Sequence, residues 1–571
     1  MHTTTDAWEV RMSALSRFFP GAVALSHYER GWLRTDVVAG VTVAAYLIPQ
    51  VMAYAEVAGL EPVAGLWAIM GSLLVYAVFG SSRQLSVGPE SSTALMTAVA
   101  IAPLAGGDPG RYAVLAAALA LLVGAVCVIG WLARLGFLAD LLSRPVLVGY
   151  MAGIAVIMIV GQLGKVAKVS VDGETIVAAV RSFLREAHNA HLPTIVLAAA
   201  VLTFLVTAGK LWPRLPVALI GVLLATAATA LFSLRDFDIR VVGEIPAEFR
   251  VPGLPGVSGA DLVALLLPAI GVAVVGYSDN VLTARSFATR NGYRIDANAE
   301  LLALGASNLA SGLLRGFPVS SSASRTSIGD ALRSRSQAHS LVALAVVALA
   351  LLFGRSVLGN FPTAALGALV IYAAFRLIEL TEFGRIARFR RSELVIALAT
   401  VVAVLLLGVL YGVLAAIALS ILNLLRRVAR PHDGVLGYVP GVAGMHDIDD
   451  YEAAKQVPGL VVYRYDAPLF FANADNFRQR ALAAVEEAPT PPRWFLLNAE
   501  ANVEIDLTAI DALGELRDEL DRRGVVFAMA RVKQDLRDDL ERAGFLDRVG
   551  DDRVFATLPT AVAAFRAADQ L

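Results

Sequence analysis

A polar stretch, Gly316-Phe-Pro-Val-Ser-Ser-Ser-Ala-Ser-Arg-Thr-Ser327, interrupts a long apolar region in the second half of the chain. Backbone in a membrane must be satisfied internally, so such a stretch is stable there only when protein or a water-filled cavity surrounds it. A charged residue at that depth, here Arg325, favours a functional role. The stretch therefore predicts a short, broken helix whose N-terminus binds an anion.

The composition places the chain among proteins that cross a membrane many times. Of its 571 residues, 57% are hydrophobic and 17% are charged, whereas soluble domains carry about 25% charged residues. Apolar runs such as 112–132 and 394–410 contain no charge. They are long enough to cross a hydrocarbon core of ~30 Å as helices, which argues against a large soluble α/β protein.

Charge is distributed unevenly along the chain. From Gly434 to the end there are 15 basic and 24 acidic residues, and the remainder holds 33 basic and 25 acidic ones. We therefore expect a cytoplasmic N-terminal segment (1–34), a transmembrane domain (35–428) and a cytoplasmic C-terminal domain (434–571). With Cys127 as the single cysteine, an internal disulfide and a multi-thiolate metal site are excluded.

Fourteen apolar spans are predicted, two of them short. They lie near 36–54, 62–79, 86–102, 112–132, 144–163, 193–212, 214–233, 262–287, 298–314, 316–327, 339–353, 362–378, 393–410 and 411–425. The first is expected to kink or break at Pro49 and Gln50. The third and the tenth are too short to cross the bilayer core alone.

The third and tenth spans both begin with a polar segment that contains proline, at residues 86–93 and 316–327. They lie seven spans apart, and because seven is odd, a second set of seven would be inserted upside down. Interrupted segments in matching positions predict inverted repeats with a site at the membrane midplane. The alternative is that the prolines merely end loops.

Basic residues predict that both termini are cytoplasmic. With that orientation the cytoplasmic side holds arginine clusters within residues 285–294, 333–335, 385–391 and 426–430. The loop between the fifth and sixth spans is an exception, because Lys165 and Lys168 lie on the opposite side.

The C-terminal domain alternates between strand and helix patterns. Strands are predicted at 460–465, 493–498, 524–530 and 553–557, and helices at 476–485, 509–522 and 533–543. This order predicts a small α/β domain, and its acidic surface does not suit nucleic acid. Its sequence has no phosphate loop, catalytic triad or metal-ligand cluster, so no enzyme is predicted.

Asp506 comes just before a predicted helix of this domain, and Thr508 lies in the first turn. Aspartate is a favoured N-cap residue, so capping is one interpretation. A phosphorylation or ligand site at these two residues is the other.

Asp279 and Thr283 lie four residues apart in the eighth span and share one helical face. A carboxylate buried beside hydroxyls can bind Na⁺ or carry a proton. A structural ion pair with Arg325 is the alternative. Gln50 and Tyr54, one turn apart in the first span, could line the same cavity, although Tyr54 could equally be a packing residue.

Arg325 lies about one turn inside the short tenth-span helix, where free N–H groups and a partial positive charge favour an anion. Ser321, Ser322 and Ser324 could complete a shell around an oxyanion. Glu90, in the first turn of the other short helix, would stabilise that helix but repel a bound anion. Pairing with Arg325 or protonation would remove this conflict.

Taken together, these residues make the whole chain resemble the SulP family of anion transporters, most closely its mycobacterial, actinobacterial type. The matching segments are 36–54, 86–90, 143–150, 296–305, 322–326 and a C-terminal region similar to a STAS domain. The resemblance implies an α-helical polytopic membrane protein with seven plus seven inverted spans, half-helices at spans 3 and 10, and a homodimer.

The resemblance also implies an anion site between the two half-helices. Its residues would be Gln50, Tyr54, Glu90, Ser91, Ser322, Ala323, Ser324 and Arg325, with Asp279 and Thr283 at the cation position. Many bacterial relatives have glutamate where this chain has Gln50, which leaves Asp279 as the coupling group. Members of the bicarbonate type lack the run of three serines, which favours an oxyanion with more acceptors.

The expected function is secondary active uptake of an inorganic anion, sulfate first, coupled to H⁺ or Na⁺ across the bacterial cytoplasmic membrane. The alternatives are a Na⁺-bicarbonate symporter and a membrane-anchored sensor that signals through the STAS-like domain. Besides the coupling ion no cofactor is expected. A regulatory protein or a nucleotide could bind the STAS-like domain.

Overall fold

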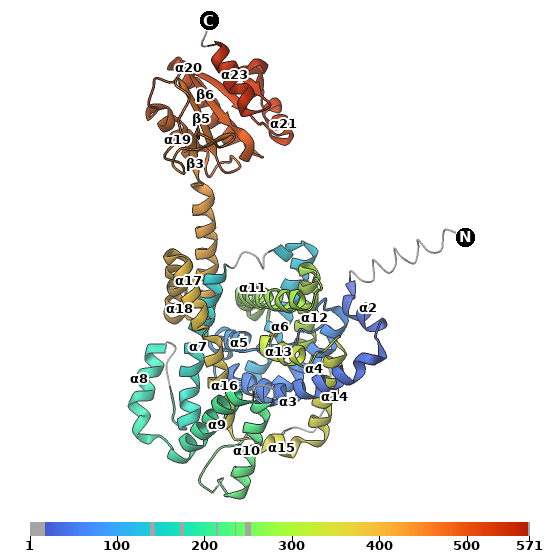
Figure 1. Cartoon of the computed structure of the whole chain (residues 1–571). Helices are drawn as coiled ribbons and strands as arrows, with labels where there is room; N and C mark the ends of the chain where they lie inside the picture. The colour runs from blue at the N-terminus through green and yellow to red at the C-terminus, as the bar shows by residue number, and fades with distance from the viewer. Residues whose placement is uncertain are drawn as a thin grey trace, which may run out of the picture. The chain divides into compact units, whose positions relative to one another are not determined.

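The computed structural model describes residues 18–137, 143–171, 176–212, 215–234, 236–245 and 253–568. The chain forms two compact units, residues 1–420 and 421–571 (Figure 1). In its described part the first unit consists of helices and one pair of short strands, and the second is an α/β domain. Half of the predicted N-terminal segment, residues 1–17, lies outside the described residues.

Among the described residues, eight helical stretches of the first unit are long and apolar enough to cross a membrane. They are Arg30–Val57, Pro62–Phe79, Pro109–Leu132, Arg144–Ala167, Leu192–Leu211, Gly259–Arg290, Thr363–Phe389 and Arg391–Gly408. Shorter apolar helices are α5 (Ser91–Ala105), α10 (Val217–Leu231) and α14 (Ala338–Phe353). The predicted class, a polytopic helical membrane protein, is confirmed. The count of fourteen spans and the inverted repeat stay predictions.

Two helices bear on details of the predicted spans. Helix α3 (Leu33–Val57) continues through Pro49, so the span is not interrupted there. Proline is tolerated in membrane helices because neighbouring groups satisfy the freed carbonyl. Spans thirteen and fourteen lie in one helical stretch, α18 (Arg391–Ala429), which breaks at Gly408, close to the predicted boundary between residues 410 and 411. The φ angle of 79° at this residue is left-handed, a conformation that glycine adopts without steric cost.

Small residues let the helices of the first unit approach one another closely. Helix α12 (Ala297–Leu313) packs on α6 (Pro109–Leu132), and a Cβ atom on Gly124 would lie only 2.8 Å from the Gly305 carbonyl oxygen. Such contacts hold membrane helices together because lipid provides no hydrophobic drive between them. Together with α4 (Pro62–Phe79) and α11 (Gly259–Arg290), α12 packs against the two short strands.

The two strands bring together the polar starts of the predicted third and tenth spans. Strand β1 (Val87–Gly88) pairs antiparallel with β2 (Ser320–Ser321). Each strand leads within a few residues into a short helix, α5 after β1 and α13 (Ala323–Ala331) after β2. Segments more than 200 residues apart in the sequence therefore present two helix N-termini side by side.

The second unit contains one mixed sheet of six strands in the order β4-β3-β5-β6-β7-β8. These are β3 (Asp433–Tyr438), β4 (Met445–Asp447), β5 (Leu460–Tyr465), β6 (Trp494–Asn498), β7 (Val526–Ala530) and β8 (Val554–Phe555). Strands β5 to β8 run parallel, as the alternating pattern predicts. The two N-terminal strands, β3 and β4, were not predicted.

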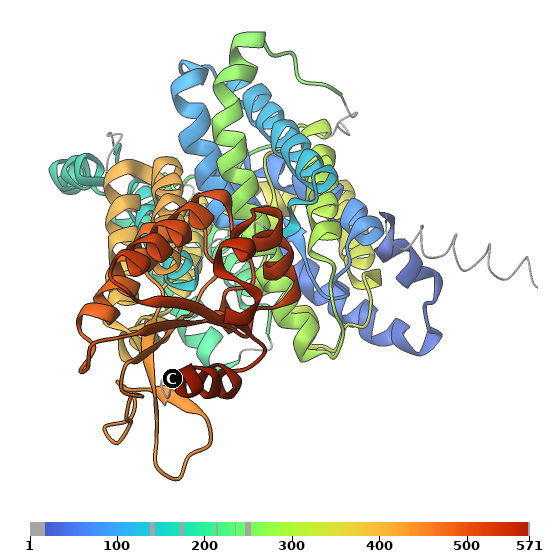
Figure 2. The ribbon, with the colours of Figure 1, turned by 90° about the horizontal axis from the view of Figure 1, so that it is seen from above.

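Helices cover both faces of this sheet (Figure 2). In β5, Val461 and Tyr463 pack in the core with α19 (Ala474–Glu486), α20 (Leu507–Arg522) and α21 (Gln534–Arg542), whereas Leu460 and Val462 pack in a second core with α23 (Leu558–Ala568). Successive side chains of a strand point to opposite faces, which explains the division. The unit has its own hydrophobic core on each face.

Candidate functional site

A cavity of about 620 Å³ lies in the first unit beside the starts of α5 and α13. Of the ten membrane residues predicted for the site, nine line this cavity: Gln50, Tyr54, Glu90, Ser91, Asp279, Thr283, Ser322, Ala323 and Ser324. The tenth, Arg325, is fully buried behind the lining. The structure thus gathers residues from α3, α5, α11 and α13 around one space.

Both short helices begin at the cavity without a side-chain cap. The N-cap residues are Glu90 for α5 and Ser322 for α13, and neither side chain accepts a hydrogen bond from its helix. The first turns therefore offer N–H groups that have no partner within the helix. Ser91 and Ala323, the first residues of the two helices, line the cavity. Two helix N-termini at one cavity suit a small anion.

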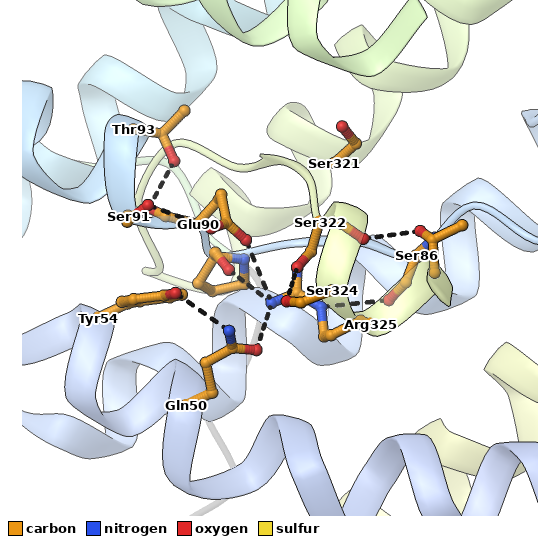
Figure 3. A network of polar contacts seen from close by, with 12 residues as sticks. Gln50, Tyr54, Ser86, Glu90, Ser91, Thr93, Ser321, Ser322, Ser324 and Arg325 are labelled. Carbon is orange, nitrogen blue, oxygen red and sulfur yellow. Dashed lines mark hydrogen bonds and ion pairs between the residues drawn. The ribbon is translucent and has the colours of Figure 1, made fainter. Parts of the chain in front are cut away.

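Arg325 joins the two helix starts to α3 (Figure 3). Its Nη1 donates to the Pro89 carbonyl oxygen at 2.9 Å and to Gln50 Oε1 at 3.2 Å, and its Nε donates to Ser86 Oγ at 3.3 Å. Glu90 Oε2 lies 3.7 Å from Nη1, a charge neighbour rather than a hydrogen-bond partner. The pairing of Glu90 with Arg325, one of the two alternatives considered from the sequence, is therefore present, although loose.

Gln50 connects Arg325 to Tyr54. Its Oε1 accepts from Arg325, and its Nε2 donates to the Tyr54 hydroxyl at 3.0 Å. An amide supplies both an acceptor and donors, whereas an ionised carboxylate only accepts. Glutamine at this position thus links the two side chains without adding a charge.

Asp279 faces β2 rather than Arg325. Its Oδ2 accepts a hydrogen bond of 3.1 Å from Ser321 Oγ, and within the described residues no ion pair joins it to Arg325. The structural ion pair considered from the sequence is therefore not formed. Thr283 lines the cavity one turn further along the same helix. Oxygen atoms of these three side chains could hold a Na⁺ ion, or the carboxylate could carry a proton.

The remaining serines of the site, apart from Ser320, bond to side chains within it. The oxygens of Ser322 and Ser324 lie 3.1 Å apart, and Ser91 Oγ donates to Glu90 Oε1 at 3.2 Å. Ser320 Oγ is buried and has no hydrogen-bond partner among the described residues. Hydroxyl groups both donate and accept, so these serines can turn toward an anion without loss of a fixed structural bond.

Glu300 is a functional candidate that the sequence analysis missed. This fully buried carboxylate in α12 accepts hydrogen bonds from Tyr76 Oη (2.9 Å), from the backbone N (2.9 Å) and Oγ (2.7 Å) of Ser81, and from Asn280 Nδ2 (2.7 Å). Asn280 follows Asp279 in α11, so the last bond fixes how α11 is rotated. The Asp-Ala-Asn-Ala-Glu pattern ending at Glu300 was the available signal.

In the second unit Asp506 is the N-cap of α20. Its Oδ1 accepts from Ala509 N at 2.8 Å, and its Oδ2 accepts from Phe471 N at 2.7 Å. Thr508 is exposed in the first turn. These contacts favour the capping interpretation for Asp506, and a regulatory role stays a prediction. Across the described residues no three His, Cys, Asp or Glu side chains are placed to hold a metal ion.

Replacing Asp506 by alanine is expected to destabilise the second unit by about 1–2 kcal/mol, because the α20 cap and the Phe471 N–H each lose an acceptor. Thr508→Ala, in the same exposed turn, is the control and should leave stability nearly unchanged. Thermal unfolding of an isolated domain of residues 430–571 measures both effects. Equal stability of the two variants would contradict the capping role.

A polytopic helical unit in which two short helices begin side by side at a polar cavity is typical of a membrane transporter. The chain belongs to the sulfate permease family, whose match covers residues 33–400, and a STAS domain matches residues 451–561. This confirms the resemblance found from the sequence. It also identifies the second unit as a STAS domain, and the family consists of transporters rather than enzymes.

Several known proteins are similar over nearly the whole chain. A probable sulfate transporter of Mycobacterium tuberculosis is 61% identical over 96% of this chain and 98% of its own length. The chloroplastic sulfate transporter 4.1 of Arabidopsis thaliana is 30% identical over 93% of this chain and 81% of its own length. The structure of SLC26A9 matches the fold with a TM-score of 0.90 at 22% identity, covering 99% of this chain and 95% of that one.

Proposed function

We propose that the protein is a secondary active importer of sulfate, coupled to H⁺ or Na⁺. The observation that carries the proposal is the meeting of two uncapped helix N-termini and the carboxylate of Asp279 at one cavity. The names of the relatives support sulfate as the anion, since the mycobacterial protein is described as a probable sulfate transporter at 61% identity.

In this proposal the anion lies between α5 and α13 and accepts hydrogen bonds from their first-turn N–H groups and from Ser91, Ser322 and Ser324. Asp279 takes up the cation, and its neutralisation lowers the repulsion that a dianion would meet. Movement of the helices around this site would then expose it alternately to the two sides of the membrane.

The proposed orientation has both termini in the cytoplasm of a bacterium. Lys165 and Lys168, the exceptions to the basic-residue pattern, lie on the non-cytoplasmic side in this orientation. Both are paired in the structure, because Lys165 Nζ lies 3.1 Å from Glu56 Oε2 and Lys168 pairs with Asp238. The charge excess on that side is therefore offset locally. We also propose a homodimer, and a regulatory protein or nucleotide as the ligand of the STAS domain near Asp506 and Thr508.

Uptake by proteoliposomes under an imposed H⁺ or Na⁺ gradient tests the function. Sulfate is expected to accumulate above equilibrium, and bicarbonate and fumarate to accumulate less. Accumulation of bicarbonate alone with a Na⁺ gradient would identify a Na⁺-bicarbonate symporter instead. Absence of transport for all three anions, together with a protein partner bound by the STAS domain, would identify a membrane-anchored sensor.

A further inference from the structure

Three arginines line the cavity, each at or near one end of its helix. Arg144 begins α7 (Arg144–Ala167), Arg290 ends α11, and Arg376 lies in the last turn of α16 (Thr363–Leu377). Arg144 Nε lies 3.0 Å from Glu382 Oε2, and Arg290 Nη1 lies 3.4 Å from Asp330 Oδ2. Carboxylates outside the lining thus neutralise two of the three.

Arg376 differs from both, because within the described residues it takes part in no ion pair. It also differs from Arg325, which is fully buried, lies outside the lining and has Glu90 beside it. The C-terminal end of a helix carries a partial negative charge that favours an arginine there without neutralising it. Arg376 is therefore the lining cation whose charge is left for an incoming ion.

The charge balance of the lining depends on this side chain. The lining carboxylates are Glu90, Asp279 and Glu379. Glu90 faces Arg325, which leaves the other two to be offset from within the cavity. Arg376 offsets one of these two charges, so its loss would make the lining more negative by one charge, and a cavity with low-dielectric walls concentrates such a field on the ion inside it.

We propose that Arg376 is the residue that sets the affinity of the cavity for its anion and its preference for a divalent over a monovalent one. The inference rests on the proposed function and adds a specificity-determining residue to it. Coulomb energy is proportional to the charge of the ligand. Loss of one positive charge therefore lowers the binding free energy of a dianion by twice as much as that of a monoanion. The fold-change for the dianion is then the square of that for the monoanion.

The test measures binding and uptake of sulfate and of nitrate, a monovalent oxyanion, by the full chain. For Arg376→Gln we expect the half-saturating concentration of sulfate to rise about tenfold and that of nitrate about threefold. Maximal uptake should be retained, and raised ionic strength should shrink the difference from wild type. Arg376→Lys should stay near wild type. Arg388→Gln removes an exposed arginine in the last turn of α17 (Leu380–Phe389), outside the cavity lining, and is the matched control.

The outcomes separate this inference from the proposed function. If the wild-type protein binds and transports sulfate but Arg376→Gln behaves like Arg388→Gln, the inference is overturned and the function stands. Equal fold-changes for sulfate and nitrate, or a loss of maximal uptake with unchanged half-saturation, would also overturn it. If the wild-type protein neither binds nor transports an anion, the proposed function fails first and the role of Arg376 fails with it.

Discussion

Replacing Asp279 by asparagine is expected to abolish accumulation of the anion against its gradient, while exchange at equal concentrations continues. Asparagine has nearly the same size and can still accept the hydrogen bond that Ser321 Oγ donates at 3.1 Å. It carries no negative charge and no acidic proton, so it can neither attract Na⁺ nor transfer H⁺. Coupling should be lost while the anion site beside α5 and α13 persists.

Proteoliposomes loaded with unlabelled sulfate measure exchange, and empty ones under a cation gradient measure accumulation. Asp279→Glu retains the charge and should retain some accumulation. Asp261→Asn is the control because it removes a carboxylate at the start of the same helix, away from the cavity. If Asp279→Asn still accumulates sulfate above equilibrium, the coupling group is another residue. Equal loss of exchange and accumulation would instead place Asp279 in the anion site itself.

The polar interruptions of the sequence predicted where the site would form. The starts of the third and tenth spans stood out because hydroxyl groups and Arg325 are rare in apolar surroundings, and the structure pairs these starts as β1 and β2. Nine predicted residues line one cavity. For four of them helix periodicity was the signal, because it places Gln50 with Tyr54 and Asp279 with Thr283 on common faces.

Other features depend on contacts that hydropathy does not report. Helix α8 (Ile176–Glu186) and α17 are amphipathic and occupy predicted loops, because a half-polar helix has too low a mean hydropathy to count as a span. The burial of Glu300 depends on donors from two other segments, residues 76–81 and Asn280 in α11. Arg144 and Arg290 each have an acidic partner and Arg376 has none among the described residues. This difference depends on side-chain contacts that the sequence does not show.

The position of Arg325 is the point on which sequence and structure differ most. As an anion ligand it would project into the cavity, but its guanidinium is fully buried and bonded to the backbone before α5 and to α3. Its Nη2 has no hydrogen-bond partner among the described residues. We therefore expect its main role to be mechanical, holding the two helix starts in register so that their N–H groups face one space.

Replacing Arg325 by methionine is expected to lower the stability of the solubilised protein by about 3–5 kcal/mol, because removal of one member of a buried charge pair leaves Glu90 without its charge partner and the Pro89 carbonyl without its hydrogen-bond donor. Arg325→Lys should be nearly as harmful, since one ammonium group cannot replace the planar fork that reaches Gln50, Pro89 and Ser86.

Thermal unfolding with and without sulfate distinguishes this mechanical role from direct ligation. A ligand at 100 times its Kd stabilises the folded state by about 2.7 kcal/mol. If Arg325 were only an anion ligand, Arg325→Lys would unfold at the wild-type temperature without sulfate and lose only the shift that sulfate produces. Glu90→Gln combined with Arg325→Met should recover part of the lost stability, because the orphaned charge is removed together with its partner. Additive losses in that double variant would show that the pair does not couple, and the 3.7 Å contact would then carry no energy.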